Sequence, residues 1–378
     1  MPHPTAGAVV VVGAGAAGLA TAAALREHGS DVQVLERADR VGAAWAARYD
    51  SLHLHTVRWL SGLPGLPIPR SYGRWVARDD LVSYLTAYAR KGSIEPELGT
   101  TVVRIDRTDT GSGWLVRTEA GDRPASRVVM ATGYSHTPRR PTWTGVETFT
   151  GDLRHSADYR EPSAYAGQHV LVVGAGNSAT EIALDLLGAG ARVTLSVRTA
   201  PNIVRRDTLG VPSQLFGIAM KRVPERMMNP LTATLRRISV PDLSAQGLPP
   251  ARNPYTHFRE TGTVPILDTG IVDAVRSGRI PVVAATESID GATVHLADGT
   301  TIRPDAVVAA TGFATGLEPV VGHLGVLDQR GVPLVHGADD LPTARGLHFV
   351  GIKAELSGLL REIGLEARRV GRALAERA

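Results

Sequence analysis

The stretch Val9-Val10-Val11-Val12-Gly13-Ala14-Gly15-Ala16-Ala17-Gly18 decides the fold of this chain. Val9–Val12 is a continuous β-branched run, which is typical of a strand buried on both faces. The alanine-rich run Leu19–Leu25 that follows the glycines is typical of a helix, and Gly29 can end it. Asp31–Leu35 then predicts a second buried strand. The segment therefore predicts a βαβ unit, the beginning of a parallel sheet covered by helices.

A second unit of the same kind follows about 160 residues later. Val170–Val173 leads into Gly174-Ala175-Gly176-Asn177-Ser178-Ala179, a helix is predicted over Thr180–Leu187 with Gly190 as its cap, and Arg192–Val197 is the next strand. Each unit is also followed by an apolar strand that runs into a Thr-Gly turn, Thr132-Gly133 in the first and Thr311-Gly312 in the second. The sequence predicts an α/β protein with two Rossmann-like domains.

The order of these units along the chain suggests that one domain is inserted into the other. We expect a discontinuous first domain made of residues 1–144 and 305–378, with residues 145–304 as the inserted second domain. The stretch of about 208–264 is irregular and rich in proline, contains a possible amphipathic run at Leu215–Met228, and is interpreted as a lid-like insertion. Asp298-Gly299 indicates a hairpin, and Gly358–Ala373 predicts a final amphipathic helix.

Composition narrows the chemistry. The 378 residues include no cysteine, which excludes disulfides, Cys-ligated zinc, iron–sulfur clusters and thiol redox chemistry. The net charge of +4 is small and spread along the chain, so we expect no nucleic-acid partner. We also expect no membrane segment, because no run reaches 18 apolar residues, and a cytoplasmic location. The 12 histidines are scattered, so no metal site is predicted.

The first glycine motif has the residues that a dinucleotide pyrophosphate needs. Gly13 permits the tight turn, Gly15 lets the backbone approach the pyrophosphate, and Gly18 allows the helix to lie close to the strand. Glu36 follows the second strand, where a carboxylate can accept hydrogen bonds from ribose hydroxyls. The alternative is a glycine-rich turn beside a surface glutamate. We interpret the motif as a dinucleotide site.

The second motif differs from the first in a way that favours NADPH. Ala179 stands where the first motif has its third glycine, which the fingerprint allows. The following strand ends in Arg198-Thr199, and Arg198 can pair with a 2′-phosphate, unless it is only a solvated strand end. Two dinucleotide sites in one chain suggest electron transfer between a tightly held flavin and a nicotinamide.

Between the two motifs, Phe149-Thr150-Gly151-Asp152-Leu153-Arg154-His155-Ser156-Ala157-Asp158-Tyr159 matches F-x-G-x-x-x-H-x-x-x-Y. This pattern, just before the second glycine motif, resembles the flavin-containing monooxygenases of class B; Tyr159 and Arg160 depart from the Trp and Pro of Baeyer–Villiger enzymes. Other stretches look like the auxin-forming YUCCA-type branch: Glu36–Asp39 with Gly42 and Trp45, Arg48–His55, Leu63–Pro69, Asn177-Ser178, Thr263–Asp268 and Asp305.

The resemblance implies an enzyme that uses FAD and NADPH. NADPH would reduce FAD, dioxygen would add to give a peroxyflavin, and this would oxygenate an amine or sulfide heteroatom or an α-keto acid. Its partners would be dioxygen and a small-molecule substrate, with a homodimer as one admissible assembly. One alternative is a flavin reductase or NADPH oxidase of the same fold without coupled oxygenation. Another is a flavin-binding protein without enzymatic activity.

The resemblance also implies individual site residues. His55 and Asn177 are the predicted catalytic residues; His55 lies where many animal-type members have an asparagine, although His53 and His55 are equally compatible with an alternating strand pair. His155 is expected to position the link between the domains and NADP, or to be purely structural. The late helix is expected to point its N-terminus at the flavin, or simply to close the domain. The remaining predicted cofactor-binding residues, besides the glycines, Glu36, Ala179 and Arg198, are Arg37, Gly42, Trp45, Thr132, Gly133, Asn177, Ser178, Thr199, Thr311, Gly312, Leu356, Ser357 and Leu359.

Overall fold

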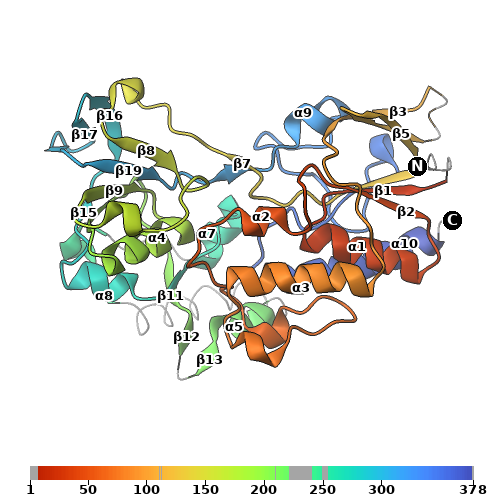
Figure 1. Ribbon diagram of the computed structural model, residues 1–378, viewed down its shortest axis with the longest axis horizontal. Coiled ribbons are helices and arrows are strands. Elements are labelled where there is room, and N and C mark those ends of the chain that lie inside the picture. Colours follow the sequence, from red (N-terminus) through yellow and green to blue (C-terminus); the bar gives the residue numbers. More distant parts are fainter. Residues whose placement is uncertain are drawn as a thin grey trace. The chain divides into compact units, whose positions relative to one another are not determined.

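A computed structural model describes residues 7–109, 111, 113–208, 210–220, 241–248 and 254–376. The chain divides into two compact units, whose elements are labelled in Figure 1. The first unit comprises Met1–Ala47, Thr56–Thr137 and Phe313–Ala378, and the second comprises Arg48–His55 and Pro138–Gly312.

The first unit is built on the predicted βαβ segment. Strands β2 (Val32–Leu35), β1 (Val9–Val12), β6 (Arg127–Met130) and β21 (Leu347–Phe349) form a parallel sheet in that order, with Val9 opposite Val32 and Arg127. Helix α1 (Ala16–Glu27) follows β1, and Gly29 at φ +80° lets Ser30 N–H donate to the Leu25 carbonyl at 3.1 Å. The predicted strands, helix and cap are confirmed.

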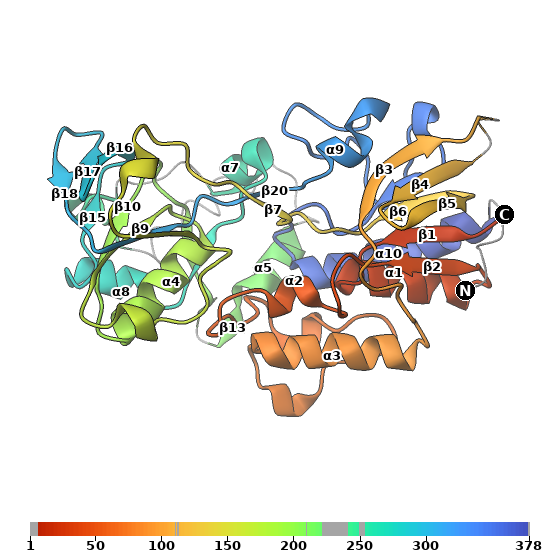
Figure 2. The ribbon, with the colours of Figure 1, turned by 45° about the horizontal axis from the view of Figure 1, so that its top comes forward.

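Each face of this sheet is covered by a different layer. Val10 and Val12 contribute to a core with Trp114, which belongs to the antiparallel sheet β3 (Val102–Arg107), β4 (Trp114–Thr118) and β5 (Gly121–Ala125). Helices α1 and α10 (Leu359–Glu376) lie side by side in Figure 2, and a Cβ at Gly371 of α10 would come within 2.8 Å of the Ala24 carbonyl oxygen. The predicted C-terminal helix is confirmed, and a glycine at its contact with α1 permits the close approach.

The second unit repeats this architecture. Strands β15 (Val282–Val283), β10 (Arg192–Ser196), β9 (His169–Val173), β19 (Ala306–Ala309) and β8 (Asp152–His155) form a parallel sheet in that order. Helix α4 (Asn177–Gly188) follows β9, and Gly190 at φ +85° lets Ala191 N–H donate to the Leu186 carbonyl at 3.0 Å. The α/β class with two Rossmann-like units is confirmed.

Strand β19 changes the expected boundary between the units. The sequence-based division at residue 305 assigns Ala306–Ala309 to the first domain, whereas the strand lies between β9 and β8 in the second sheet. The second compact unit accordingly continues to Gly312 and also takes in residues 48–55 and 138–144. The physical reason is hydrogen bonding on both edges of β19, which fixes a strand more firmly than its position in the chain.

The second sheet is also covered on both faces. Helices α4 and α8 (Ile271–Arg276) contribute Ile182 and Val275 to a core with Val170 and Val172. Leu171 and other residues of the opposite face contact the antiparallel sheet β16 (Thr286–Asp290), β17 (Thr293–Leu296) and β18 (Thr301–Ile302). The predicted hairpin at Asp298-Gly299 joins β17 to β18, with Gly299 at φ +81°.

The part of the chain expected to be a lid is described only in pieces. Strand β11 (Ile203–Arg205) pairs with β14 (Ile266–Asp268), and β12 (Asp207–Thr208) pairs with β13 (Val211–Pro212). Helix α5 (Ser213–Met220) contains the start of the expected amphipathic run, and α7 spans Pro254–Thr261. Residues 209, 221–240 and 249–253 lie outside the described part, so the lid stays a prediction.

One remaining helix, of 14 residues, is long, and the other remaining elements are short. They are α2 (Ala43–Ala46), α3 (Arg78–Lys91), α9 (Glu318–Val321), β7 (Thr137–Pro138), β20 (Phe313–Ala314) and the 3₁₀ turns η1 (Arg58–Leu60), η2 (Arg70–Tyr72), η3 (Val146–Thr148), η4 (Ser163–Tyr165), η5 (Ser244–Gln246), η6 (Gly322–Leu324) and η7 (Pro342–Ala344). Among the described residues, none of the helices has the length and apolar character needed to cross a bilayer.

Candidate active site

The three glycines of the first motif each meet a different steric requirement. Gly13 has φ +108°, and a Cβ there would lie 2.8 Å from the Ala131 carbonyl oxygen. A Cβ on Gly18 would lie 1.8 Å from the Gly13 carbonyl oxygen, so the helix and the turn touch at this point. Gly15 has nothing within 4 Å of such a Cβ. The open position is the one that the fingerprint assigns to the pyrophosphate.

The start of α1 is suited to an anion. Gly15 is its N-cap and provides no side-chain hydrogen bond, so the first backbone N–H groups of the helix keep their donor capacity. Glu36 is half-buried beside this turn: its two carboxylate oxygens accept hydrogen bonds from Ala14 N at 2.7 Å and Ala38 N at 2.9 Å. The carboxylate is therefore held in a fixed orientation and keeps further lone pairs for ribose hydroxyls.

Some of the other residues predicted to bind this dinucleotide lie around the same turn. Gly42 donates its N–H to the Ala14 carbonyl at 3.1 Å from a left-handed conformation, and half-buried Trp45 lies in α2 directly after it. The Thr132 hydroxyl is buried and has no partner in the described part of the chain, as expected of a group that awaits a ligand. Gly133 has φ +77°, and Arg37 is exposed.

The second glycine turn has the same form. Gly174 has φ +130° and would clash through a Cβ with the Ala310 carbonyl oxygen at 2.4 Å, whereas Gly176 faces open space. Ala179 is fully buried, and α4 also begins without a side-chain cap. Both turns therefore fit the pyrophosphate of a dinucleotide.

The residues that follow strand β10 include a positively charged side chain exposed to solvent. Arg198 and Thr199 are both exposed. The described residues offer the Arg198 guanidinium neither a hydrogen bond nor an ion pair, so it keeps all its donors for a phosphate. Ser178 is half-buried in the first turn of α4.

Asn177 has a structural task in the second unit. Its Oδ1 accepts from Leu267 N at 3.0 Å, and its Nδ2 donates to the Pro265 carbonyl at 3.4 Å. Both ends of the amide thus hold the segment that enters β14 against the start of α4. This arrangement fixes the backbone of the glycine turn, and a direct catalytic role for Asn177 stays a prediction.

His155 fastens the fingerprint strand β8 to the second Thr-Gly turn. Its ring is fully buried, with Nδ1 accepting from Ala157 N at 3.0 Å and Nε2 donating to the Gly312 carbonyl at 3.1 Å. Burial lowers the pKa of His155 below its ordinary value. Thr311 donates its hydroxyl to the Arg139 carbonyl at 2.5 Å. His155 is therefore a neutral connector in this structure rather than an exposed base.

His55 is held by a carboxylate that the sequence did not single out. Its Nε2 contacts Glu181 Oε1 in α4, and Tyr49 donates its hydroxyl to the other oxygen, Oε2, at 2.6 Å. His53 and His55 lie outside the named strands, and His53 takes part in a single β-bridge. Asp50 N–H donates to the Arg160 carbonyl at 2.8 Å within the same segment.

A row of tyrosines continues from Tyr49 into the core of the second unit. The Tyr49 and Tyr159 rings meet edge to face at 6.3 Å, and Tyr159 stacks on Tyr165 at 6.1 Å. Tyr159 donates to Asp185 at 2.8 Å. Burial, followed by the charge of Glu181, holds the pKa of Tyr49 well above its ordinary value, so this hydroxyl stays a donor. Tyr159, where Baeyer–Villiger enzymes are expected to have tryptophan, is thus part of a bonded network.

The residues predicted to contact the flavin at the start of the last helix lie in a turn that is partly or fully buried. Ser357 is fully buried and donates to Glu362 Oε1 at 2.6 Å, while Leu356 and Leu359 are half-buried. The Ser357 hydroxyl thus contributes to the first turn of α10. Whether the backbone of this turn contacts a flavin stays a prediction.

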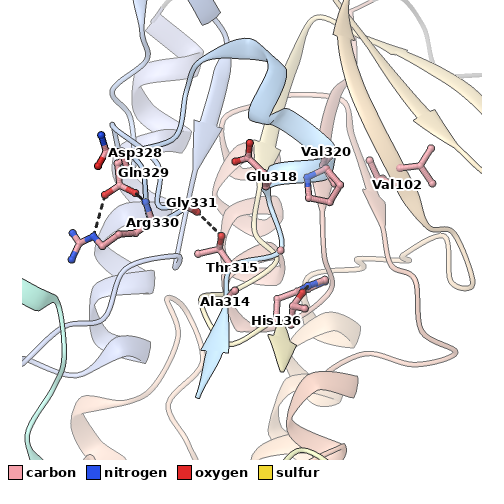
Figure 3. Close-up of a pocket in the computed structure, with 14 residues that line it drawn as sticks. Val102, His136, Ala314, Thr315, Glu318, Val320, Asp328, Gln329, Arg330 and Gly331 are labelled. Carbon is pink, nitrogen blue, oxygen red and sulfur yellow. Dashed lines mark hydrogen bonds and ion pairs between the residues drawn. The ribbon is translucent and has the colours of Figure 1, made fainter. Parts of the chain in front are cut away.

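A cavity of about 760 Å³ lies elsewhere in the first unit (Figure 3). Its wall includes His136, Thr315 and Glu318, and the figure marks the Thr315–Gly331 hydrogen bond of 2.5 Å. None of the predicted site residues lines it. No group of three or more metal-ligating side chains occurs among the described residues.

Glu181, Tyr49 and Asp185 are the residues of this site that sequence reasoning missed. Tyr49 and Glu181 are 132 positions apart, and no local pattern links them. The available signal is the spacing of Glu181 and Asp185, two acids four residues apart on the helix that follows a glycine turn.

Two nucleotide-fitting turns in two Rossmann-like units define a flavoprotein of the pyridine nucleotide class. The profile of the family described as "Pyridine nucleotide-disulphide oxidoreductase" matches residues 10–211. Because the chain has no cysteine, the disulfide chemistry in that description has no thiol here.

Comparison with individual proteins defines the family more narrowly. A rice protein (Oryza sativa subsp. japonica) named Indole-3-pyruvate monooxygenase YUCCA1 is 34% identical over 90% of this chain and 86% of its own length. The Arabidopsis thaliana protein named Probable indole-3-pyruvate monooxygenase YUCCA4 is 32% identical over 92% and 86%. The structure of a flavin-containing monooxygenase from Stenotrophomonas maltophilia is similar at 25% identity, with a TM-score of 0.73 and coverage of 98% and 99%.

The chain belongs to the class B flavin-dependent monooxygenases. The expected resemblance is confirmed, and the enzyme uses FAD and NADPH to transfer oxygen to a small organic molecule.

Proposed function

We propose that this monooxygenase acts on an aromatic α-keto acid of the indole-3-pyruvate type. The observation that carries the proposal is the similarity, at 31–34% identity over 82–96% of the chain, to eight proteins, four named indole-3-pyruvate monooxygenase and four named probable indole-3-pyruvate monooxygenase. In the reaction, the keto acid, dioxygen, NADPH and a proton give the carboxylic acid one carbon shorter, carbon dioxide, NADP⁺ and water. The bond between the keto carbon and the carboxylate breaks, and a bond from one dioxygen atom to the keto carbon forms.

Within this proposal each glycine turn has its own cofactor. FAD supplies the redox chemistry with dioxygen, and NADPH supplies the hydride. The unit that contains Gly13, Gly15 and Gly18 holds FAD, and Glu36 orients a ribose of it. The unit that contains Gly174, Gly176 and Ala179 holds NADPH. The fixed Glu36 carboxylate and the unpaired buried Thr132 hydroxyl support the first assignment, and the exposed Arg198 guanidinium supports the second.

Side chains of the protein then bind NADPH and hold the surrounding turns in place. Arg198 neutralises the 2′-phosphate of NADPH. His55 provides a hydrogen-bonding ring near the reacting groups, while Asn177 and His155 keep the turns around the nicotinamide nucleotide in place. The hydrogen bonds of Asn177 to residues 265–267 and of His155 to Gly312 support these roles, because they leave the loops little freedom.

The proposal extends to setting and assembly. We place the enzyme in the cytoplasm, where NADPH is abundant, and expect a homodimer if the enzyme is not monomeric. Light scattering coupled to gel filtration gives the mass of the assembly, to be compared with 40.0 kDa for one chain.

Coupling measurements test the substrate class. Purified enzyme with FAD is supplied with NADPH and, in separate reactions, indole-3-pyruvate, phenylpyruvate, a tertiary amine or a thioether. The proposal expects one carboxylic acid and one carbon dioxide per NADPH with an aromatic keto acid, and little hydrogen peroxide. Oxygenation of only the amine or thioether would overturn the substrate class. Peroxide in proportion to NADPH with every compound would favour the NADPH oxidase.

A further inference from the structure

Residues Arg48–His55 are bound to the second unit although the residues on both sides belong to the first. Ala47 and Thr56 are assigned to the first unit, and the eight residues between them to the second. Asp50 N–H donates to the Arg160 carbonyl at 2.8 Å, and Arg160 Nη1 donates to the Arg48 carbonyl at 3.2 Å. The segment thus behaves as part of the unit proposed to hold NADPH.

A single carboxylate contacts side chains near both ends of the 48–55 segment. Glu181 lies one turn after Asn177 in α4, and its side chain is only 13% exposed. Oε2 accepts the hydroxyl of Tyr49, which is buried in the core of the second unit, and Oε1 contacts Nε2 of His55. A half-buried carboxylate with both oxygens occupied is a rigid support, since losing either bond would leave a poorly solvated charge.

The contact with Glu181 determines which ring nitrogen of His55 is left for an incoming molecule. A carboxylate only accepts, so the Nε2 atom that contacts it carries the proton. Nδ1 finds no hydrogen-bond partner among the described residues, and the side chain is 25% exposed. The ring therefore offers Nδ1 to an incoming molecule and cannot turn over without breaking its contact with Glu181.

We propose that Glu181 is a positioning residue for oxygen transfer: it fixes the orientation of His55 on the NADPH-binding unit so that Nδ1 faces the reacting molecules. The inference rests on the proposed function only in giving His55 a place in the catalytic machinery. It assigns Glu181 no contact with substrate or cofactor. Tyr49 keeps the carboxylate in place from the other side.

The test compares variants of the full-length enzyme with a control on the same helix. Glu181→Ala removes both bonds, and His55→Ala removes the ring. Glu181→Gln keeps an uncharged acceptor oxygen for His55 Nε2, while its NH2 group can donate to the Tyr49 hydroxyl oxygen. Asp185→Ala is the matched control, because it deletes the neighbouring carboxylate-to-tyrosine bond of 2.8 Å with Tyr159. We expect Glu181→Ala and His55→Ala each to lower oxygenated product per NADPH about tenfold, and the double variant to be no worse than either.

Two readouts separate positioning from general damage. Hydrogen exchange of the 48–55 peptide should accelerate in Glu181→Ala and stay slow in Glu181→Gln and Asp185→Ala. The affinity for NADP⁺, measured by calorimetry, should stay within about threefold in all variants, and Glu181→Gln should recover most of the coupling.

Several results would overturn the inference. These are additive effects of Glu181→Ala and His55→Ala, the same loss of coupling in Asp185→Ala, unchanged exchange of residues 48–55, or a Glu181→Gln enzyme as impaired as Glu181→Ala. The substrate proposal fails separately. If wild-type enzyme oxygenates a thioether but no keto acid, the coupling of the variants is measured with the thioether as substrate. The hydrogen-exchange measurement requires no substrate and tests the role of Glu181 in either case.

Discussion

Replacing Gly18 by alanine should damage the first unit far more than the size of one methyl group suggests. The added Cβ would lie 1.8 Å from the Gly13 carbonyl oxygen and 2.9 Å from its carbon. Ordinary van der Waals contact begins at 3.4 Å, so the turn and helix α1 must separate by about 1.6 Å at this point. The obstacle is backbone at the centre of the βαβ unit, and no rotamer change relieves it.

The expected cost can be scaled from overpacked cores. Such substitutions typically destabilise by about 1–3 kcal/mol, and a clash of backbone with Cβ at this distance belongs at or above the upper end. A loss of about 3 kcal/mol corresponds to a fall in melting temperature of about 6–12 °C for a unit of this size. The second motif accommodates Ala179 at the same position, so the requirement is set by local geometry rather than by the fingerprint.

Gly15→Ala is the matched control, because nothing lies within 4 Å of its Cβ. Thermal unfolding is measured for both variants after removal of FAD, since bound ligand would add its own stabilisation. Gly18→Ala should melt well below wild type, and Gly15→Ala should melt within about 2 °C of it. Equal melting temperatures for Gly18→Ala and wild type would refute the steric reasoning.

Three further predictions address the nucleotide sites and acid stability. Arg198→Ala should raise KM for NADPH about tenfold and leave KM for NADH nearly unchanged, because the exposed guanidinium pairs with the 2′-phosphate; equal changes in steady-state assays would remove that role. Gly15→Trp should emerge from gel filtration without flavin absorbance, because the indole fills the open space at the turn, and a fully loaded variant would contradict the assignment. Burial lowers the pKa of His155 below 6.5, so as the pH falls the unfolded chain binds a proton at a higher pH than the folded chain does. The contribution of His155 to stability is therefore present above pH 6.5 and declines as the pH falls through the lowered pKa. His155→Gln should accordingly flatten the decline of melting temperature between about pH 7 and pH 5, and an unchanged slope would count against this account.

The local parts of the fold follow from the sequence because they depend on neighbouring residues. Four consecutive valines can only form a buried strand here, and Gly29 and Gly190 end their helices at the expected places. Strand β19 was assigned to the wrong side of a boundary, since its partners β9 and β8 are selected by the register of the sheet. Position in the chain carries no information about that register.

The two Thr-Gly turns show why side-chain roles are harder to predict. Their sequences match, yet the Thr132 hydroxyl is buried without a described partner and the Thr311 hydroxyl is bonded to the Arg139 carbonyl. The difference comes from a residue 172 positions away. The same limitation concealed Glu181, whose partners are 126 and 132 positions distant.

The assignment of Arg48–His55 to the second unit limits the modularity of this enzyme. A protein engineer who exchanged residues 138–312 alone for those of a relative would separate Tyr49 from its core and leave the Glu181 carboxylate without either of its partners. A transplantable cassette must therefore consist of two pieces of chain, the short one embedded within the host. Recombination between homologous genes meets the same constraint, so crossovers that separate the two pieces should yield fewer functional chimeras than crossovers that keep them together.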